Sequence, residues 1–239
     1  MTEPVRLSKR IAELLSCSRR EAEQYIEGGW VLVDGQCIEE QGYRVLPQQK
    51  VELLPEASLA PVAPVTILLH KPAGIDIDAN SAAQIISPET HADDDRSSIR
   101  FIQKHLSGLT LVLPLESYAS GLLVLTQDWR IERKLTTDAA KVEQEFIVEV
   151  SGEIVADGLK LLNHGLKFKG RELAPVKASW QNESRLRFAL KGVQAGQIKN
   201  MCEQVGLNVL TIRRIRIGRL PMAGLQAGQW RYLLGYEQF

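Results

Sequence analysis

The sequence lacks the features that mark membrane, disulfide-rich and metal-binding proteins. A helix that spans a bilayer needs about 20 mostly apolar residues, and the 239-residue chain has no run that approaches this length. Its start, MTEPVRLSKR, has no apolar core behind its charges, so we predict no secretory signal. The three cysteines are far apart and odd in number, and the four histidines lack ligand spacing. We therefore expect a cytoplasmic protein with no metal, no disulfide framework and no membrane contact.

Neither sign of charge is in excess. Lys and Arg together number 29, Asp and Glu together number 29, and the formal net charge is zero. This balance excludes a uniformly basic coat for nucleic acid, although it allows local basic patches. With 44% hydrophobic and 24% charged residues, the composition is that of a globular protein. The length fits one large domain, or one domain with a small module.

Residues 1–54 predict a small module of two helices and short strands. Apolar residues recur at helical spacing in the first helix, at Leu7, Ile11, Leu14 and Leu15. Ser18 then stands three residues before Glu21, which is the pattern of a capping box at the start of a second helix. Strands are expected at residues 30–33 and 50–53, with a turn at Asp34-Gly35.

Residues 55–65 predict a linker, because this stretch is rich in proline and alanine and almost uncharged. The second domain is then expected over residues 66–239. Its predicted strands are 66–69, 109–113, 121–126, 145–150, 185–190 and 211–217, and its predicted helices are 99–105, 129–136, 155–163 and 197–205. This irregular order predicts an α+β fold with a mixed or antiparallel sheet and flanking helices. The acidic stretch 76–95 predicts a solvated loop.

The N-terminal pattern resembles a known RNA-binding module. RLSKRIAELLSCSRREAEQYIEGGWVLVDG, residues 6–35, is similar to the module shared by a small-subunit ribosomal protein, tyrosyl-tRNA synthetases and bacterial pseudouridine synthases. On composition alone, residues 1–60 carry 7 basic and 10 acidic residues, which favours an ordinary solvated surface. The resemblance instead implies a helix-turn-helix surface that contacts structured RNA, with candidate residues Arg6, Lys9, Arg10, Ser18, Arg19 and Arg20.

Four further stretches resemble the RsuA/RluF group of bacterial ribosomal RNA pseudouridine synthases. They are LLHKPAGI (68–75), ASGLLVLTQD (119–128), GQIKNMCEQVG (196–206) and RRIRIGRLPMAGLQAGQWRYL (213–233), in the group's order. The resemblance implies a monomer that isomerises a uridine of ribosomal RNA, in the large subunit, without a cofactor or metal. The base is flipped into a pocket, detached from its sugar, rotated and rejoined through a ring carbon.

The residues that the group uses for chemistry differ in this chain. The group's catalytic aspartate lies four residues before the Ser-Gly pair, so Ser120-Gly121 places Glu116 there. The group's arginine is replaced by Pro114, which has neither a charge nor an N–H. The tyrosine that stacks on the base is replaced by Phe146, and a nearby lysine by Gln144. Phe146 keeps a stacking face. The longer Glu116 displaces the carboxylate by about 1 Å, which can cost about 100-fold in rate.

Several basic residues remain near this expected site. Lys71 lies in the KPAG turn and Lys199 in the GQIKNM helix. Arg214 and Arg216 alternate with isoleucines, which predicts a strand with both arginines on one polar face. Residues 191–239 hold 7 basic and 2 acidic residues. We therefore expect these four side chains to bind RNA phosphates.

Three interpretations stay open at this point. The chain is an active synthase in which Glu116 replaces the aspartate, or a non-catalytic relative that binds folded ribosomal RNA as an assembly or regulatory factor. The third is a protein-interaction module that has abandoned RNA, against which the basic turn and strand argue. Glu116 also has a plain alternative, an exposed or salt-bridged glutamate in a loop, because a lone carboxylate without a matched partner supports catalysis only weakly.

Overall fold

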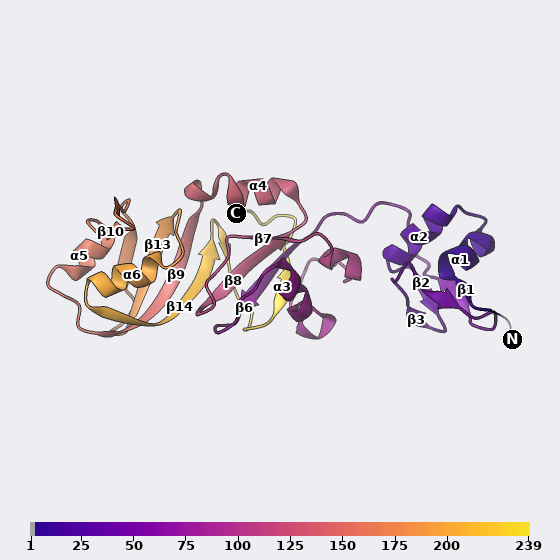
Figure 1. Cartoon of the computed structure of the whole chain (residues 1–239), viewed down its shortest axis with the longest axis horizontal. Helices are drawn as coiled ribbons and strands as arrows, with labels where there is room; N and C mark the ends of the chain where they lie inside the picture. The colour runs from indigo at the N-terminus through magenta and orange to yellow at the C-terminus, as the bar shows by residue number, and fades with distance from the viewer. Residues whose placement is uncertain (1–2) are drawn as a thin grey trace. The chain divides into compact units, whose positions relative to one another are not determined.

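A computed structural model describes residues 3–239 of the chain (Figure 1). The chain forms two compact units. The N-terminal unit contains the described residues up to Pro64 together with residues 100–108, and the C-terminal unit contains residues 65–99 and 109–239. The expected assignment of 1–54, 55–65 and 66–239 to a module, a linker and a second domain stays a prediction. That residues 100–108 join the N-terminal unit was not foreseen.

Two helices and short strands build the N-terminal unit, as predicted. The elements are β1 (Val5–Arg6), α1 (Leu7–Leu15), α2 (Arg19–Glu27), β2 (Val31–Val33), β3 (Gln36–Cys37), β4 (Arg44–Val45) and β5 (Val51–Leu53). Strand β1 pairs with β4, and β2 lies between β3 and β5 in a second sheet. The apolar faces of both helices are buried against these strands, with Leu7, Ile11, Ile26 and Val31 at the centre.

The predicted capping box begins α2. Ser18 Oγ accepts the Glu21 N–H at 3.2 Å, and the Ser18 N–H donates to Glu21 Oε2 at 2.7 Å. These two bonds satisfy backbone groups that a helix start leaves without partners. The predicted turn is also present, because Asp34 and Gly35 both have positive φ (51° and 82°), the geometry of a two-residue hairpin turn.

Residues 100–108 are an extended segment followed by one turn of 3₁₀ helix, η2 (Gln103–Leu106). Arg100 Nη2 donates to the Gly28 carbonyl oxygen at 2.7 Å, and its guanidinium carbon lies 4.4 Å from the Trp30 ring centre. The Gln103 N–H donates to Glu39 Oε2 at 2.5 Å. The predicted helix over 99–105 is wrong, because contacts with residues distant in the sequence hold this segment extended.

A mixed sheet forms the centre of the C-terminal unit, in the order β12-β13-β9-β14-β8-β6-β16. The strands are β6 (Thr66–Lys71), β7 (Thr110–Val112), β8 (Ala119–Thr126), β9 (Glu143–Gly152), β12 (Lys177–Trp180), β13 (Arg185–Lys191), β14 (Leu207–Ile217), β15 (Leu220–Pro221) and β16 (Trp230–Tyr232). Neighbours along this order are antiparallel except β14 and β8, which are parallel. The α+β class with a mixed sheet is confirmed.

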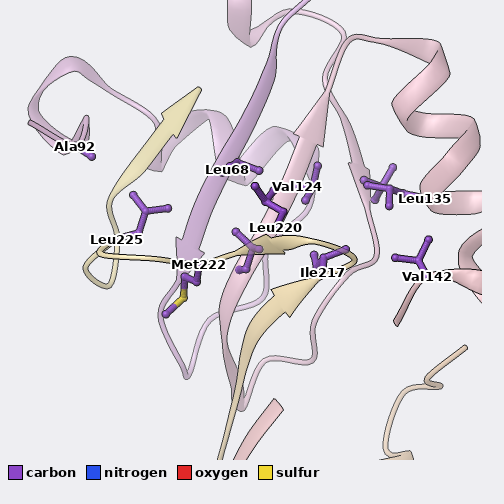
Figure 2. Packing of buried hydrophobic residues seen from close by; sticks show 11 residues of the cluster. Leu68, Ala92, Val124, Leu135, Val142, Ile217, Leu220, Met222 and Leu225 are labelled. Carbon is purple, nitrogen blue, oxygen red and sulfur yellow. The ribbon is translucent and has the colours of Figure 1, made fainter. Parts of the chain in front are cut away.

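Helices flank this sheet (Figure 1). Helix α4 (Trp129–Thr136) contacts β7 and β8, α5 (Gly158–Asn163) contacts β12, and α6 (Gln197–Gln204) contacts β14. The remaining elements are α3 (Ala79–Ile85), η1 (Pro88–Thr90), η3 (Ala139–Lys141), β10 (Lys167–Phe168) and β11 (Arg171–Glu172). A buried cluster that includes Leu68, Val124, Leu135 and Ile217 joins β6, β8, α4 and β14 (Figure 2). This packing holds β8 and β14 in place beside the candidate site.

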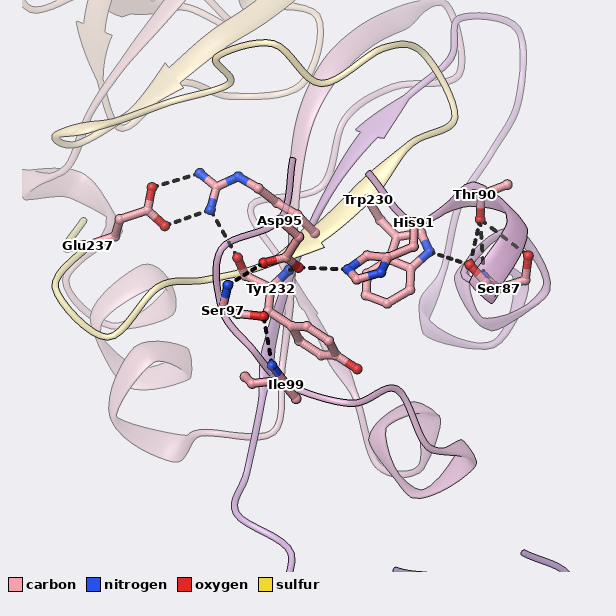
Figure 3. A network of polar contacts seen from close by, with 10 residues as sticks. Ser87, Thr90, His91, Asp95, Ser97, Ile99, Trp230, Tyr232 and Glu237 are labelled. Atoms are coloured by element: carbon pink, nitrogen blue, oxygen red, sulfur yellow. Dashed lines mark hydrogen bonds and ion pairs between the residues drawn. The ribbon is translucent and has the colours of Figure 1, made fainter. Parts of the chain in front are cut away.

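The acidic stretch 76–95 is not the solvated loop that its composition predicts. It includes α3, and the Asp95 side chain is only 3% exposed. Asp95 accepts the N–H groups of Tyr232 and Ser97 at 2.9 and 2.7 Å and pairs with His91 Nε2 at 2.7 Å (Figure 3). Burial acts to raise the pKa of Asp95, but these hydrogen bonds lower it below its usual value. His91 also stacks on Trp230, with ring centres 4.3 Å apart. The end of the stretch is thus bound to β16.

Candidate active site

A cavity of about 310 Å³ lies where the loop before β8, strands β9 and β14, and the start of α6 meet. Its charged and aromatic lining residues are Glu116, Tyr118, Phe146, Lys199 and Arg214. The structure therefore brings together both predicted catalytic positions and two of the predicted RNA-binding residues. Pro114 and Gln144, the other replaced positions, also line this cavity.

Strand register carries Phe146 and Arg214 to the cavity. Phe146 on β9 pairs with Arg214 on β14, and Arg214 pairs with Gly121 on β8. Gly121 has a φ of 110°, and a Cβ atom there would lie 2.2 Å from the Arg214 carbonyl oxygen. Only glycine permits this approach of the two strands. Gly121 therefore allows β14 to pair with β8, the strand that follows the loop that carries Glu116.

Glu116 is half-buried at the N-terminus of α6. Its Oε1 accepts the Gly196 N–H at 2.7 Å and the Tyr118 hydroxyl at 3.3 Å. Gly196 is the N-cap residue of α6, so the partial positive charge of the helix end lies next to the carboxylate. Both bonds reach the same oxygen, and within residues 3–239 Oε2 accepts no hydrogen bond. One carboxylate oxygen is thus fixed while the other can meet a ligand in the cavity.

The strand alternation predicts that Arg214 and Arg216 share one exposed face, but in the structure they do not. Arg214 is only 1% exposed. A register shift against β9 between Arg214 and Arg216 interrupts the alternation. The guanidinium donates to three acceptors: Nε to Leu122 O at 2.8 Å, Nη1 to Gln144 Oε1 at 3.0 Å, and Nη2 to Leu113 O at 2.7 Å. Burial lowers the pKa of Arg214 to about 9, and the charge of Glu116 acts in the opposite direction. Arg214 therefore braces the cavity wall.

Lys71 is buried too, although the sequence predicts an RNA contact. Its Nζ donates to the carbonyl oxygens of Pro72, Ser117 and Ala119 at 3.0, 3.0 and 2.7 Å. An ammonium group has three donors, so these bonds leave none for a phosphate. Burial lowers the pKa of Lys71, whereas the charges of Asp76 and Glu116 raise it. The structure assigns Lys71 to holding the loop directly after Glu116, which corrects the prediction.

Arg216 forms ion pairs with two carboxylates, whereas Lys199 is exposed at the cavity. Arg216 Nη2 lies 2.6 Å from Glu143 Oε1 and 2.7 Å from Glu145 Oε1. The hydrogen bond from Arg216 is the main cause that lowers the pKa of Glu145. Two carboxylates therefore oppose the predicted phosphate contact of Arg216. Lys199 is exposed, with its Nζ 5.7 Å from the Tyr118 ring centre at the cavity.

Tyr118 is a site residue that reasoning from the sequence missed. Burial, followed by the charge of Glu116, raises the pKa of Tyr118 to about 12. The phenol therefore stays protonated at neutral pH and donates to the carboxylate. Its position two residues after Glu116 in the same loop was the available signal, because a short loop keeps such neighbours within reach of one another.

The predicted RNA-binding side chains of the N-terminal unit lie at its surface. Arg6, Lys9, Ser18, Arg19 and Arg20 are exposed, and Arg10 is half-buried. Arg19 and Arg20 are the first residues of α2. The Ser18 hydroxyl already caps this helix, and Lys9 lies 3.9 Å from Glu13. Their contact with RNA stays a prediction.

Two negative findings apply to residues 3–239. No helix there is both long and apolar enough to cross a bilayer. The same residues contain no group of three or more His, Cys, Asp or Glu side chains placed to hold a metal ion.

Comparison with known proteins finds one family model and many similar sequences. Residues 5–51 match the S4 domain. The chain is 29% identical to an uncharacterized RNA pseudouridine synthase of Aquifex aeolicus, over 98% of this chain and 94% of that protein. It is 27% identical to the dual-specificity RNA pseudouridine synthase RluF of Escherichia coli K12, over 98% of this chain and 77% of that protein. It is 28% identical to the ribosomal large subunit pseudouridine synthase B of Bacillus subtilis, over 97% of this chain and 93% of that protein.

The fold also resembles that of a solved structure. A crystal structure of a pseudouridylate synthase superposes with a TM-score of 0.59 and 18% identity, over 96% of each chain. This similarity supports the same fold for the described residues.

Proposed function

Because the chain belongs to the RsuA/RluF family of pseudouridine synthases, we propose that it binds structured RNA and converts a uridine of ribosomal RNA to pseudouridine. The N-terminal S4 domain supports the binding of structured RNA. Ribosomal RNA of the large subunit as the substrate, a monomeric state and a cytoplasmic location are parts of the same proposal.

One observation carries the catalytic part of this proposal. Glu116 lines a cavity with Phe146 and Arg214, and the start of α6 fixes its carboxylate at 2.7 Å. An exposed loop glutamate, the plain alternative, would lack both the cavity and the fixed orientation. Positioning of a reacting group is a main source of enzymatic rate. The cavity therefore supports a carboxylate prepared for a reaction on a flipped base.

The proposed reaction gains and loses no atoms. The bond between the ribose and the ring nitrogen breaks, a bond from the ribose to a ring carbon forms, and a proton leaves that carbon while another is gained at the nitrogen. Glu116 Oε2 would act as nucleophile or base beside the sugar and ring. The Phe146 ring would hold the detached base by stacking. Lys199, exposed at the cavity, would hold the backbone of the flipped nucleotide.

A gene deletion with mapping of pseudouridine in ribosomal RNA tests this function. We expect one site to disappear in the source organism, to return with the wild-type gene and to stay absent with Glu116→Gln. Glutamine keeps an Oε1 that can accept the Gly196 and Tyr118 bonds, so this variant should fold and bind RNA. Glu183→Gln, at an exposed glutamate, is the matched control and should restore the site.

A second function is favoured by the buried cation. Arg214 donates to Leu113, Leu122 and Gln144 and forms no ion pair with Glu116, while Pro114 supplies no charge. This arrangement suits a relative that binds ribosomal RNA without turnover. An unchanged pseudouridine map would overturn the synthase proposal, and crosslinking of the protein to ribosomal RNA in the same cells would then support the second function.

A further inference from the structure

A second concave surface of the C-terminal unit is lined mainly by basic residues. It encloses about 800 Å³ between α4, η3, the start of β9, the end of β13 and the turn from β14 to β15. Its basic lining residues are Arg130, Arg133, Lys134, Lys141, Lys191 and Arg219, and its acidic ones are Asp138 and Glu143. We call this surface the basic groove.

The acidic residues of the basic groove already have cationic partners. Asp138 pairs with Lys141 at 2.7 Å, and Glu143 pairs with Arg216 at 2.6 Å. Arg130 is likewise bound to Asp128 at 2.7 Å. Four exposed cations remain that form no ion pair or side-chain hydrogen bond within residues 3–239: Arg133, Lys134, Lys191 and Arg219. Phe239, the last residue of the sequence, also lines the groove and brings one carboxylate beside Gly218, so cations still outnumber carboxylates there.

The basic groove and the cavity lie near the same ends of β9 and β13. On β9, Glu143 lines the groove and Gln144 lines the cavity. After β13, Lys191 lines the groove and Val193 lines the cavity. Successive residues of a strand project to opposite faces of a sheet, so Glu143 and Gln144 place the groove and the cavity on opposite faces at the same end of β9. An RNA strand that passes around this end of the sheet would reach both surfaces.

We propose that the basic groove binds the ribose-phosphate backbone of an RNA segment that flanks the nucleotide held in the cavity and passes around the end of β9; this rests on the proposed function. Arginine and lysine together suit phosphate oxygens, and a concave row of cations follows a polyanion regardless of its sequence. The N-terminal segment 1–60 has an excess of three acidic residues, so its positive charge is confined to local clusters such as Arg19 and Arg20. The groove is then one source of the salt dependence of RNA binding, separate from the N-terminal unit.

Salt titration with a short RNA tests the groove. The probe is a fluorescein-labelled oligouridylate of 12 nucleotides, and the full chain is compared with Arg133→Ala/Lys134→Ala/Lys191→Ala. Each lost phosphate contact flattens the slope of log K against log salt by about 0.7 for a single strand, so we expect a slope lower by about 2. The control Lys160→Ala/Arg171→Ala/Lys177→Ala removes three exposed cations of the same unit outside the groove, and its slope should equal that of the wild type.

Equal slopes for both triple variants would overturn the proposal, as would a wild-type chain that does not bind the probe in a salt-dependent way. Competition by poly-L-glutamate as strong as that by unlabelled oligouridylate would assign the groove to an acidic protein segment instead. The assay needs no turnover, so an inactive synthase still tests the groove. A chain that makes pseudouridine yet shows equal slopes would overturn the groove alone.

Discussion

The basic side chains of the two units are used in different ways. In the N-terminal unit, Arg19 and Arg20 lie exposed at the start of α2. In the C-terminal unit, Lys71 and Arg214 are buried, and most of their hydrogen bonds go to backbone carbonyl oxygens around Glu116. All four were predicted to bind RNA. A cation in a family motif can therefore either bind the ligand or stabilise the site. Its burial distinguishes the two roles, because a buried cation has its donors bonded within the protein.

Removal of the buried Arg214 should have the largest effect on stability. Arg214→Ala leaves three acceptors without donors and creates a cavity, so we expect the free energy of unfolding to fall by about 3 kcal/mol or more. The neighbouring Arg213 is exposed, and Arg213→Ala should change it by less than about 0.5 kcal/mol. Urea unfolding of both variants measures the contrast, and equal effects would remove the structural role of Arg214.

Loss of Lys71 should have the next largest effect. Lys71→Met keeps the length of the side chain but removes three donors to carbonyl oxygens, which should cost about 2 kcal/mol in the free energy of unfolding. Lys199→Met applies the same change to an exposed lysine of the same unit and should be nearly neutral. Thermal or urea unfolding compares the two. An unchanged free energy of unfolding in Lys71→Met would show that the hydrogen bonds of Lys71 do not stabilise the loop.

Local patterns in the sequence predicted the elements well. The capping box at Ser18 and Glu21 formed as expected, and strands β6, β8, β9, β13 and β14 lie within a few residues of their predicted bounds. Each of these depends on residues close together in the chain. The family resemblance also predicted that Glu116 and Phe146 share one site, and both line the same cavity. A resemblance over the whole chain implies a three-dimensional arrangement, which local patterns do not.

The failures have a common physical cause in long-range contacts. The burial of Arg214 arises from its pairing with Gly121 and Phe146, and the burial of Lys71 from carbonyl groups nearly 50 residues away. Asp95 is covered by Tyr232, far along the sequence. No local pattern records such partners. The strand alternation around Arg216 failed for the further reason that a bulge adds a residue, which periodicity does not reveal.

Ser18 allows the cap and the predicted RNA contact to be separated. Ser18→Ala removes the acceptor for the Glu21 N–H and should lower the free energy of unfolding by about 1 kcal/mol. Ser18→Asp keeps a capping oxygen, so its stability should stay close to that of the wild type. If the Ser18 hydroxyl also faces a phosphate, the aspartate should weaken RNA binding by charge repulsion. Unfolding and RNA titration of both variants decide this, and full affinity in Ser18→Asp would leave the residue as a cap only.

The exposed arginines should show the smallest effect on stability and a clear effect on binding. Arg19→Ala/Arg20→Ala should change the free energy of unfolding by less than about 0.5 kcal/mol, since neither side chain is buried. If the helix-turn-helix surface faces RNA, the slope of log K against log salt for a ribosomal RNA stem-loop should flatten by about 2, near 0.9 for each lost phosphate contact. Arg44→Ala/Lys50→Ala removes two exposed cations from the same unit and should keep the slope. An unchanged slope in the first variant would mean that these exposed arginines, unlike the buried Lys71 and Arg214, have no defined partner.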